Sequence, residues 1–157
     1  MLTVIIQAGG ESRRMGRDKA LLPFLGQPLI ARVIQRIQPV ADEIIVTTNR
    51  PQEFQFLDCP LAPDIIPGRG ALGGIYTALM AATQPLVAII ACDMPFVNPG
   101  LLDAQRTALL ARSADLVIPR YDDQLEPLPP VYDRESCLPF VYEAIQNEKW
   151  RVDAWFD

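Results

Sequence analysis

Apolar runs that suit β-strands alternate along this chain with apolar residues at helical spacing. The runs have the length and β-branched content of buried parallel strands, and the repeats between them follow the spacing of amphipathic helices. The pattern predicts strands over residues 4–7, 43–48, 86–91, 115–118 and 128–132. It predicts helices over residues 29–37, 75–82, 99–111 and 136–147, with a loop over residues 64–74. Such alternation is typical of an α/β fold, a three-layer α/β/α sandwich with a Rossmann-like and mostly parallel sheet.

Two prolines stand inside the last predicted strand. Pro129 and Pro130 have no backbone N–H to donate to a neighbouring strand. The strand over residues 128–132 should therefore lie at an edge of the sheet or be distorted.

Length and composition narrow the class of protein. The 157 residues suffice for one domain, over residues 1–157, and the absence of histidine excludes histidine-based zinc sites, Ser-His-Asp triads and imidazole catalysis. A formal net charge of -5 argues against a protein that coats nucleic acid. No uninterrupted apolar run is long enough to cross a membrane, and no basic segment precedes the first apolar run. Three widely spaced cysteines without a C-x-x-C pair suggest reduced thiols, so we expect a cytoplasmic protein. From the charge and the apolar runs we expect neither a nucleic-acid partner nor a membrane partner.

The first predicted strand leads directly into a loop rich in glycine and cations. Gly9 and Gly10 let the backbone approach a ligand and turn its N–H groups toward it. Four cations follow within seven residues: Arg13, Arg14, Arg17 and Lys19. The combination predicts a polyphosphate site, with a solvated surface turn as the alternative. The Walker loop is excluded, because five residues separate Gly10 from Gly16 and no Ser or Thr follows Lys19.

A carboxylate follows the third predicted strand. Asp93 comes just after the apolar run that ends at Cys92, and Pro95 prevents the strand from continuing. Because the carboxyl ends of parallel strands meet at one edge, Asp93 should lie near the glycine-rich loop, where it could hold Mg²⁺ beside phosphates. The alternative is an aspartate that caps a helix or makes a turn.

Residues 68–73 satisfy the dinucleotide-binding pattern G-x-G-x-x-G, but their context does not fit it. That fingerprint requires a strand that runs straight into the glycines, and Pro67 stands immediately before them. We instead expect a backbone-exposing loop around Gly70 that leads to a helix N-terminus and can grip a base edge or a phosphate. The alternative is a tight loop whose glycines serve close helix packing.

The motifs resemble those of nucleotidyltransferases with the nucleotide-diphospho-sugar transferase fold. The matching residues are Ala8-Gly9-Gly10, Ser12, Arg14-Met15-Gly16, Asp18-Lys19 and Ala91-Cys92-Asp93-Met94-Pro95-Phe96. Among these enzymes the chain is most similar to the molybdenum cofactor guanylyltransferases, and the similarity extends from Val4 to near Phe156. Gln7 replaces the family's usual leucine, at a position expected to offer mainly its backbone to the nucleotide.

The resemblance implies transfer of GMP from Mg-GTP to the phosphate of molybdenum-carrying molybdopterin, with release of pyrophosphate. It implies that Lys19 and Arg14 bind the triphosphate, and that Asp93 holds Mg²⁺ and serves catalysis with them. The nucleotide-binding residues that it implies are Gln7, Ala8, Gly9, Gly10, Lys19, Asn49, Asp64, Gly70 and Asp93. Of these, Asn49 and Asp64 would contact the base and the ribose. Transient contacts with molybdoenzyme maturation proteins are also implied.

Three other interpretations stay open at this point. The first is a transferase of the same fold that uses CTP or acts on a sugar or polyol phosphate, because the choice of base depends on contacts around Asn49, Asp64 and Gly70. The second is a non-catalytic nucleotide-binding or cofactor-delivery protein, since the chain stops at Asp157, before the N-x-N-T-P motif near the end of family members. The third is an α/β domain whose glycine-rich loop binds an adventitious anion.

Overall fold

A central sheet of six strands organises the chain, whose computed structural model describes residues 1–9, 18–126, 129–149 and 151. In spatial order the strands are β5 (Leu61–Ala62), β4 (Glu43–Thr47), β1 (Leu2–Gln7), β6 (Leu86–Ala91), β10 (Val131–Asp133) and β7 (Leu116–Val117). The pairs β5–β4, β4–β1 and β1–β6 are parallel, and β10 runs antiparallel to both of its neighbours. The sheet is thus mostly parallel, as the sequence predicts.

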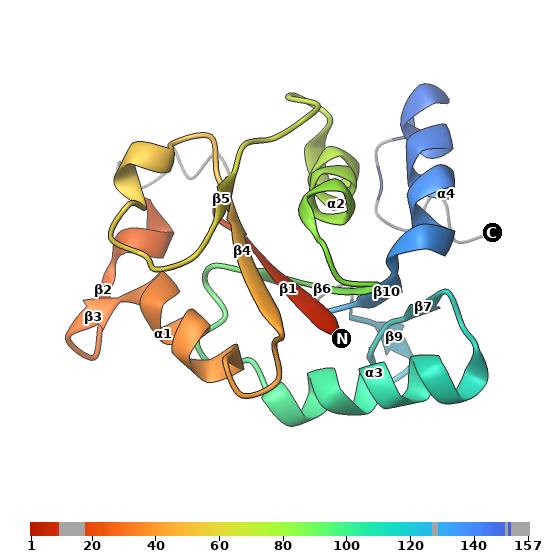
Figure 1. Ribbon diagram of the computed structural model, residues 1–157, viewed down its shortest axis with the longest axis horizontal. Helices are drawn as coiled ribbons and strands as arrows, with labels where there is room; N and C mark the ends of the chain where they lie inside the picture. Colours follow the sequence, from red (N-terminus) through yellow and green to blue (C-terminus); the bar gives the residue numbers. More distant parts are fainter. Residues whose placement is uncertain (10–17, 127–128, 150, 152–157) are drawn as a thin grey trace.

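Helices cover both faces of this sheet (Figure 1). They are α1 (Leu29–Ile37), α2 (Gly70–Ala81), α3 (Pro99–Arg112) and α4 (Arg134–Gln146). Helices α1 and α3 lie on one face, and α2 and α4 lie on the other (Figure 1). The predicted α/β/α sandwich is therefore confirmed.

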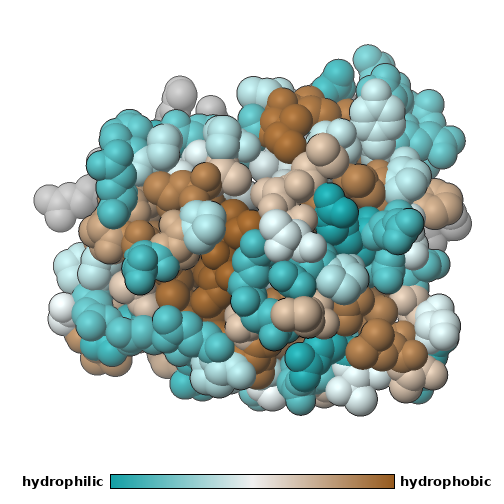
Figure 2. Space-filling model, viewed as in Figure 1, coloured by the Kyte–Doolittle hydropathy of each residue, from teal (hydrophilic) through white to brown (hydrophobic). Residues whose placement is uncertain are grey.

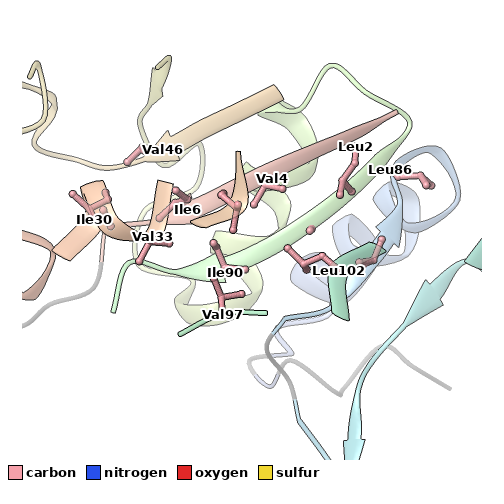
Figure 3. Close-up of a cluster of buried hydrophobic side chains, with 14 of the residues drawn as sticks. Leu2, Val4, Ile6, Ile30, Val33, Val46, Leu86, Ile90, Val97 and Leu102 are labelled. Atoms are coloured by element: carbon pink, nitrogen blue, oxygen red, sulfur yellow. The ribbon is translucent and has the colours of Figure 1, made fainter. Parts of the chain in front are cut away.

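Successive side chains of β1 enter two different hydrophobic cores. Val4 and Ile6 belong to one cluster together with Ile30 of α1 and Leu102 of α3 (Figure 3). Ile5, between them in the sequence, belongs to the opposite cluster, which α2 and α4 complete. Because both faces are buried, β1 has a continuous apolar run instead of an alternating pattern.

The remaining elements are short. They are the 3-10 helices η2 (Lys19–Leu21) and η3 (Pro51–Glu53), the hairpin of β2 (Pro23–Phe24) with β3 (Gln27–Pro28), and the hairpin of β8 (Arg120–Tyr121) with β9 (Gln124–Leu125). On the face of the molecule seen in Figure 2, the largest hydrophobic area lies over β4 and α1. No helix in the described part of the chain is long and apolar enough to cross a membrane.

The structure corrects the predicted place of the proline-containing strand. β10 begins at Val131, directly after Pro129 and Pro130, and it lies between β6 and β7 instead of at an edge. The carbonyl oxygens of the two prolines accept hydrogen bonds from neighbouring residues, a role that requires no N–H. Pro130 accepts from the Ile89 N–H at 3.3 Å, and Pro129 accepts from the Gln105 side chain at 2.7 Å.

Helix α2 begins at Gly70, inside the segment predicted as a loop. Gly73 and Gly74 are therefore helical, despite the low helix propensity of glycine. Packing explains the first of them, because a Cβ at Gly73 would come within 2.8 Å of the Arg69 Cβ and 3.1 Å of the Ile66 carbonyl oxygen. The close-packing alternative considered for this segment is thus correct at Gly73.

We expect Gly73→Ala to destabilise the fold by about 1–3 kcal/mol, because the added methyl group must displace backbone and the base of a side chain. The matched control is Gly74→Ala, one position along the same helix, where the Cβ would meet the movable end of the Gln7 side chain at 2.8 Å. Urea denaturation should show a smaller loss for Gly74→Ala than for Gly73→Ala. Equal stability of Gly73→Ala and the parent chain would contradict the packing account.

Candidate nucleotide site

Three parallel strands bring their carboxyl ends to one edge of the sheet (Figure 1). In the ladder, Gln7 is in register with Thr47 of β4 and Ala91 of β6. The pairing continues one residue further, from the Ala8 N–H to the Thr47 carbonyl at 2.9 Å and from the Cys92 N–H to the Gln7 carbonyl at 3.1 Å. The residues that follow each strand therefore gather at the edge where open α/β sheets bind ligands.

A small hollow of about 230 Å³ opens at this edge. Its lining residues are Gln7, Ala8, Asp18, Lys19, Ala91, Cys92 and Asp93. The Lys19 ammonium lies 3.9 Å from Oδ2 of Asp93, and both side chains are about half exposed, at 49% and 44%. The ammonium can bind phosphate oxygens, and the carboxylate can bind a divalent cation. Gly10 and Arg14, which the sequence also predicts here, lie outside the described residues.

A larger hollow of about 710 Å³ shares Gln7 with the first. Its lining residues are Gln7, Gly9, Thr47, Asn49, Asp64, Pro67, Gly68, Gly70, Ala71 and Gly74. Asn49 and Asp64 form a reciprocal pair in it. The Asn49 amide donates to Oδ2 of Asp64 at 2.8 Å, and the Asp64 N–H donates to the Asn49 side-chain oxygen at 3.0 Å. The pair presents an amide and a carboxylate together, the groups that can read base edges and ribose hydroxyls.

Gln7 lines both hollows and so connects them. Its carbonyl oxygen already accepts from Cys92, and the following Ala8 N–H already donates to Thr47. The side-chain amide of Gln7 lies beside Gly74 of the larger hollow, and the backbone role expected at this position stays a prediction. Gly74 of α2 makes room for that amide, since a Cβ there would lie 2.8 Å from Nε2 of Gln7.

Gly68 and Gly70 expose backbone at the rim of the larger hollow. Both have φ in the left-handed region, at +75° and +56°, and a Cβ at either position would meet open space. Glycine is favoured there because other residues adopt such angles at a cost. β5 ends at Ala62, well before these glycines, so the dinucleotide-binding pattern lacks the strand that it requires.

Asp18 of the small hollow forms an ion pair with Arg50, the residue after Asn49 of the larger hollow, although the sequence gives neither residue a role. The Asp18 carboxylate is only 7% exposed, accepts from the Ala20 N–H at 2.9 Å and forms an ion pair with Arg50. Arg50 directly follows Asn49 and also lies 3.3 Å from Glu53. Asp18 belongs to the matched Asp-Lys motif, but no sequence pattern connects it with a residue 32 positions away.

Asp93 is the carboxylate of the small hollow that is open to a metal ion. Asp18, the other carboxylate among the described residues that line it, is nearly buried and forms an ion pair with Arg50. Within the described ranges, no group of three or more His, Cys, Asp or Glu residues could hold a metal ion. Mg²⁺ does not need such a group, because it binds through one or two carboxylates together with substrate phosphates. The donor at Asp93 therefore fits Mg²⁺ that arrives with a nucleotide.

Cys92 lies in the small hollow as a protonated thiol. Burial raises the pKa of this thiol to about 11, and the negative charges of Asp93 and Asp18 add to the effect. At neutral pH the thiol is therefore not a nucleophile. Among the described residues that line this hollow, the charged groups open to a ligand are Lys19 and Asp93.

Asp93→Asn should make Cys92 easier to alkylate above neutral pH. Loss of the neighbouring negative charge lowers the thiol pKa, so more thiolate exists at a given pH. Iodoacetamide labelling over a neutral-to-alkaline series, followed by peptide mass spectrometry, should show labelling of Cys92 beginning at a lower pH. Cys137, whose pKa burial raises to about 12, is the internal control and should not change. An unchanged Cys92 profile would contradict the placement of the Asp93 carboxylate beside it.

Known proteins with similar sequences and structures identify the family. Residues 4–154 match the model of the MobA-like NTP transferase domain. The chain is 40% identical over 154 residues to a protein of Carboxydothermus hydrogenoformans named probable molybdenum cofactor guanylyltransferase, with 96% of this chain and 75% of that protein covered. It is 35% identical over 161 residues to the molybdenum cofactor guanylyltransferase of Shewanella amazonensis, with 99% and 80% covered. The crystal structure of molybdopterin-guanine dinucleotide biosynthesis protein A from Archaeoglobus fulgidus matches with a TM-score of 0.81 and 25% identity, over 98% of this chain and 78% of that one. The resemblance seen in the motifs is thus confirmed, and the chain belongs to the MobA-like NTP transferase family of nucleotidyltransferases.

Proposed function

We propose that the chain transfers GMP from Mg-GTP to the phosphate of molybdopterin that carries molybdenum. Pyrophosphate leaves, and the product is the molybdopterin guanine dinucleotide cofactor. The observation that carries the proposal is the pair of joined hollows, one lined by Lys19 and Asp93 and the other by Asn49 and Asp64. A nucleoside triphosphate has two corresponding parts. Its triphosphate carries the negative charge, and its base and ribose form hydrogen bonds.

The smaller hollow suits the phosphoryl chemistry. An oxygen of the acceptor phosphate attacks the α-phosphorus of GTP in line, and the bond from that phosphorus to the pyrophosphate oxygen breaks. The attacking phosphate is already ionised at neutral pH, so no side chain has to remove a proton from it. A chain without histidine is compatible with such a reaction. Lys19 neutralises negative charge as it moves onto the leaving pyrophosphate.

Asp93 would hold Mg²⁺, which would supply positive charge that offsets the negative charge of the phosphates. The Asp93 carboxylate lies 3.9 Å from the Lys19 ammonium, so a metal ligand and a cation stand beside the same phosphate chain. Arg14 would add positive charge, and Gly10 would donate its backbone N–H to the phosphates, while Gly9 would offer its backbone from the larger hollow that it lines. Catalysis in this proposal consists of positioning and charge neutralisation.

The larger hollow suits the guanine and the ribose. The Asp64 carboxylate can accept from the guanine N1–H or the exocyclic amine, and the Asn49 amide can bond to the base or the ribose. Their mutual hydrogen bonds of 2.8 and 3.0 Å orient both groups before a nucleotide binds. Gly70 would offer backbone at the start of α2. Gln7 and Ala8 would meet the nucleotide where its two halves join.

The relatives support the choice of substrates. Two proteins that are 40% and 35% identical to this chain bear the name molybdenum cofactor guanylyltransferase, one of them as probable. The archaeal structure is that of a molybdopterin-guanine dinucleotide biosynthesis protein. From these names we infer GTP as the donor and molybdopterin as the acceptor, with transient contact to molybdoenzyme maturation proteins that receive the product.

Calorimetry should show that the chain prefers Mg-GTP to Mg-CTP and that GTP binding weakens without Mg²⁺. In Asp93→Asn the dependence on Mg²⁺ should disappear, because an amide of the same shape replaces the carboxylate that would meet the ion. Tighter binding of CTP would favour a cytidylyltransferase of the same fold. Failure to bind either nucleotide would contradict the proposal.

Pyrophosphate release from GTP should require molybdopterin, and Lys19→Ala should lower kcat/KM about 100-fold or more, as loss of one preorganised donor does elsewhere. The control is Arg112→Ala, which removes an exposed cation in the last turn of α3 and should leave turnover unchanged. Binding of Mg-GTP without turnover on any acceptor would favour a cofactor-delivery protein instead. Equal turnover by Lys19→Ala would defeat the role given to Lys19.

A further inference from the structure

We propose that the ion pair between Asp18 and Arg50 is a positioning link, which fixes the triphosphate-binding Lys19 at a set distance from the base-binding Asn49. This inference rests on the proposed function and adds two residues that the proposed reaction does not use. Neither residue has to touch the nucleotide, because each acts through the neighbour that does.

The link joins two segments that the sheet does not hold together. Asp18 and Lys19 lie at the start of η2, the next described element after β1, and Asn49 and Arg50 lie just after the end of β4. The ladder between these two strands ends before either segment begins. The ion pair crosses from one segment to the other beyond that point.

Asp18 forms the fixed end of the link. Its carboxylate is 7% exposed, so protein atoms surround it almost completely. One oxygen, Oδ1, accepts from the Ala20 N–H at 2.9 Å and caps η2, while the other, Oδ2, faces Arg50. Because Lys19 is the first residue of η2, this cap helps to set the direction in which Lys19 leaves the backbone.

Arg50 is anchored through both its backbone and its side chain. Its N–H donates to the hydroxyl of the buried Thr48 at 3.1 Å. Its second guanidinium nitrogen, Nη1, lies 3.3 Å from Oε2 of Glu53 in η3. The planar guanidinium thus contacts Asp18 and Glu53 at once, which a lysine ammonium reproduces only in part. The residue before it, Asn49, is in turn held by its hydrogen bonds to Asp64.

The link contributes more to position than to stability. The Arg50 side chain is 44% exposed, so water and salt screen the ion pair and its contribution to folding is small. A ligand that spans both hollows is more sensitive, because a small displacement of one half of its site misaligns the other half. Fixing the spacing in advance therefore raises the affinity for the whole nucleotide without changing the affinity for either half.

The decisive experiment compares the whole nucleotide with its two halves. Mg-GTP, guanosine and tripolyphosphate are titrated against the parent chain, Arg50→Met, Asp18→Asn and the double variant. Asp18→Asn keeps an oxygen that can cap η2, so it removes the ion pair and leaves the local fold in place. We expect Mg-GTP to bind about tenfold more weakly to each single variant, with guanosine unchanged and with a much smaller loss, or none, for tripolyphosphate. The double variant should lose no more than either single one, because both changes remove the same link.

Two further variants separate position from charge. Arg50→Lys keeps the charge and should recover part of the lost affinity for Mg-GTP. Arg106→Met removes the ion pair between Arg106 and Asp103 on α3 and should leave all three affinities unchanged.

Unchanged affinity of Arg50→Met for Mg-GTP would overturn the link while leaving the proposed function intact. A loss for guanosine or tripolyphosphate as large as that for Mg-GTP would also overturn it, since the effect would then be local to one half. If the parent chain prefers CTP, the same comparison with cytidine decides the question. A parent chain that binds neither nucleotide would overturn the proposed function and the link together.

Discussion

The parallel register of β4, β1 and β6 is the constraint on which the candidate site depends. It places Thr47, Gln7 and Ala91 side by side, so the segments after the three strands leave the sheet at one edge. A shift of one residue in either pairing would turn the side chains of a strand to the opposite face. Burial on both faces opposes such a shift, because Ile5 and Ile6 belong to different cores. The packing of the two cores therefore also fixes the geometry of the site.

At that edge, the two neighbouring hollows are lined by different chemical groups. An ammonium and a carboxylate face the smaller hollow, and an amide and a carboxylate that hold each other face the larger one. Gln7 belongs to both, and the Asp18–Arg50 ion pair crosses between the segments that carry the two sets of groups. A site divided in this way can bind a nucleoside triphosphate along its length. The protein then accelerates transfer by holding the reacting groups in place and neutralising charge.

The elements of the fold could be predicted because their causes are local. The strand before Asp93 is a continuous apolar run, and that is enough to place a carboxylate at the sheet edge. The start of α2 could not be predicted, since its glycines lower helix propensity and the need for Gly73 arises from contacts made in space. The pairing of Asp18 with Arg50 has the same origin, because it joins residues that are far apart in the sequence. Local pattern indicates which residues stand at the ends of the strands, but tertiary packing decides which of them meet.

The first measurement to make is a crystal structure of this chain with Mg²⁺ and a non-hydrolysable GTP analogue. We expect guanine to lie against Asn49 and Asp64, the triphosphate to reach Lys19 and Asp93, and Gln7 to lie between the two halves of the nucleotide. A nucleotide bound in the reverse orientation, or outside both hollows, would contradict the proposed site.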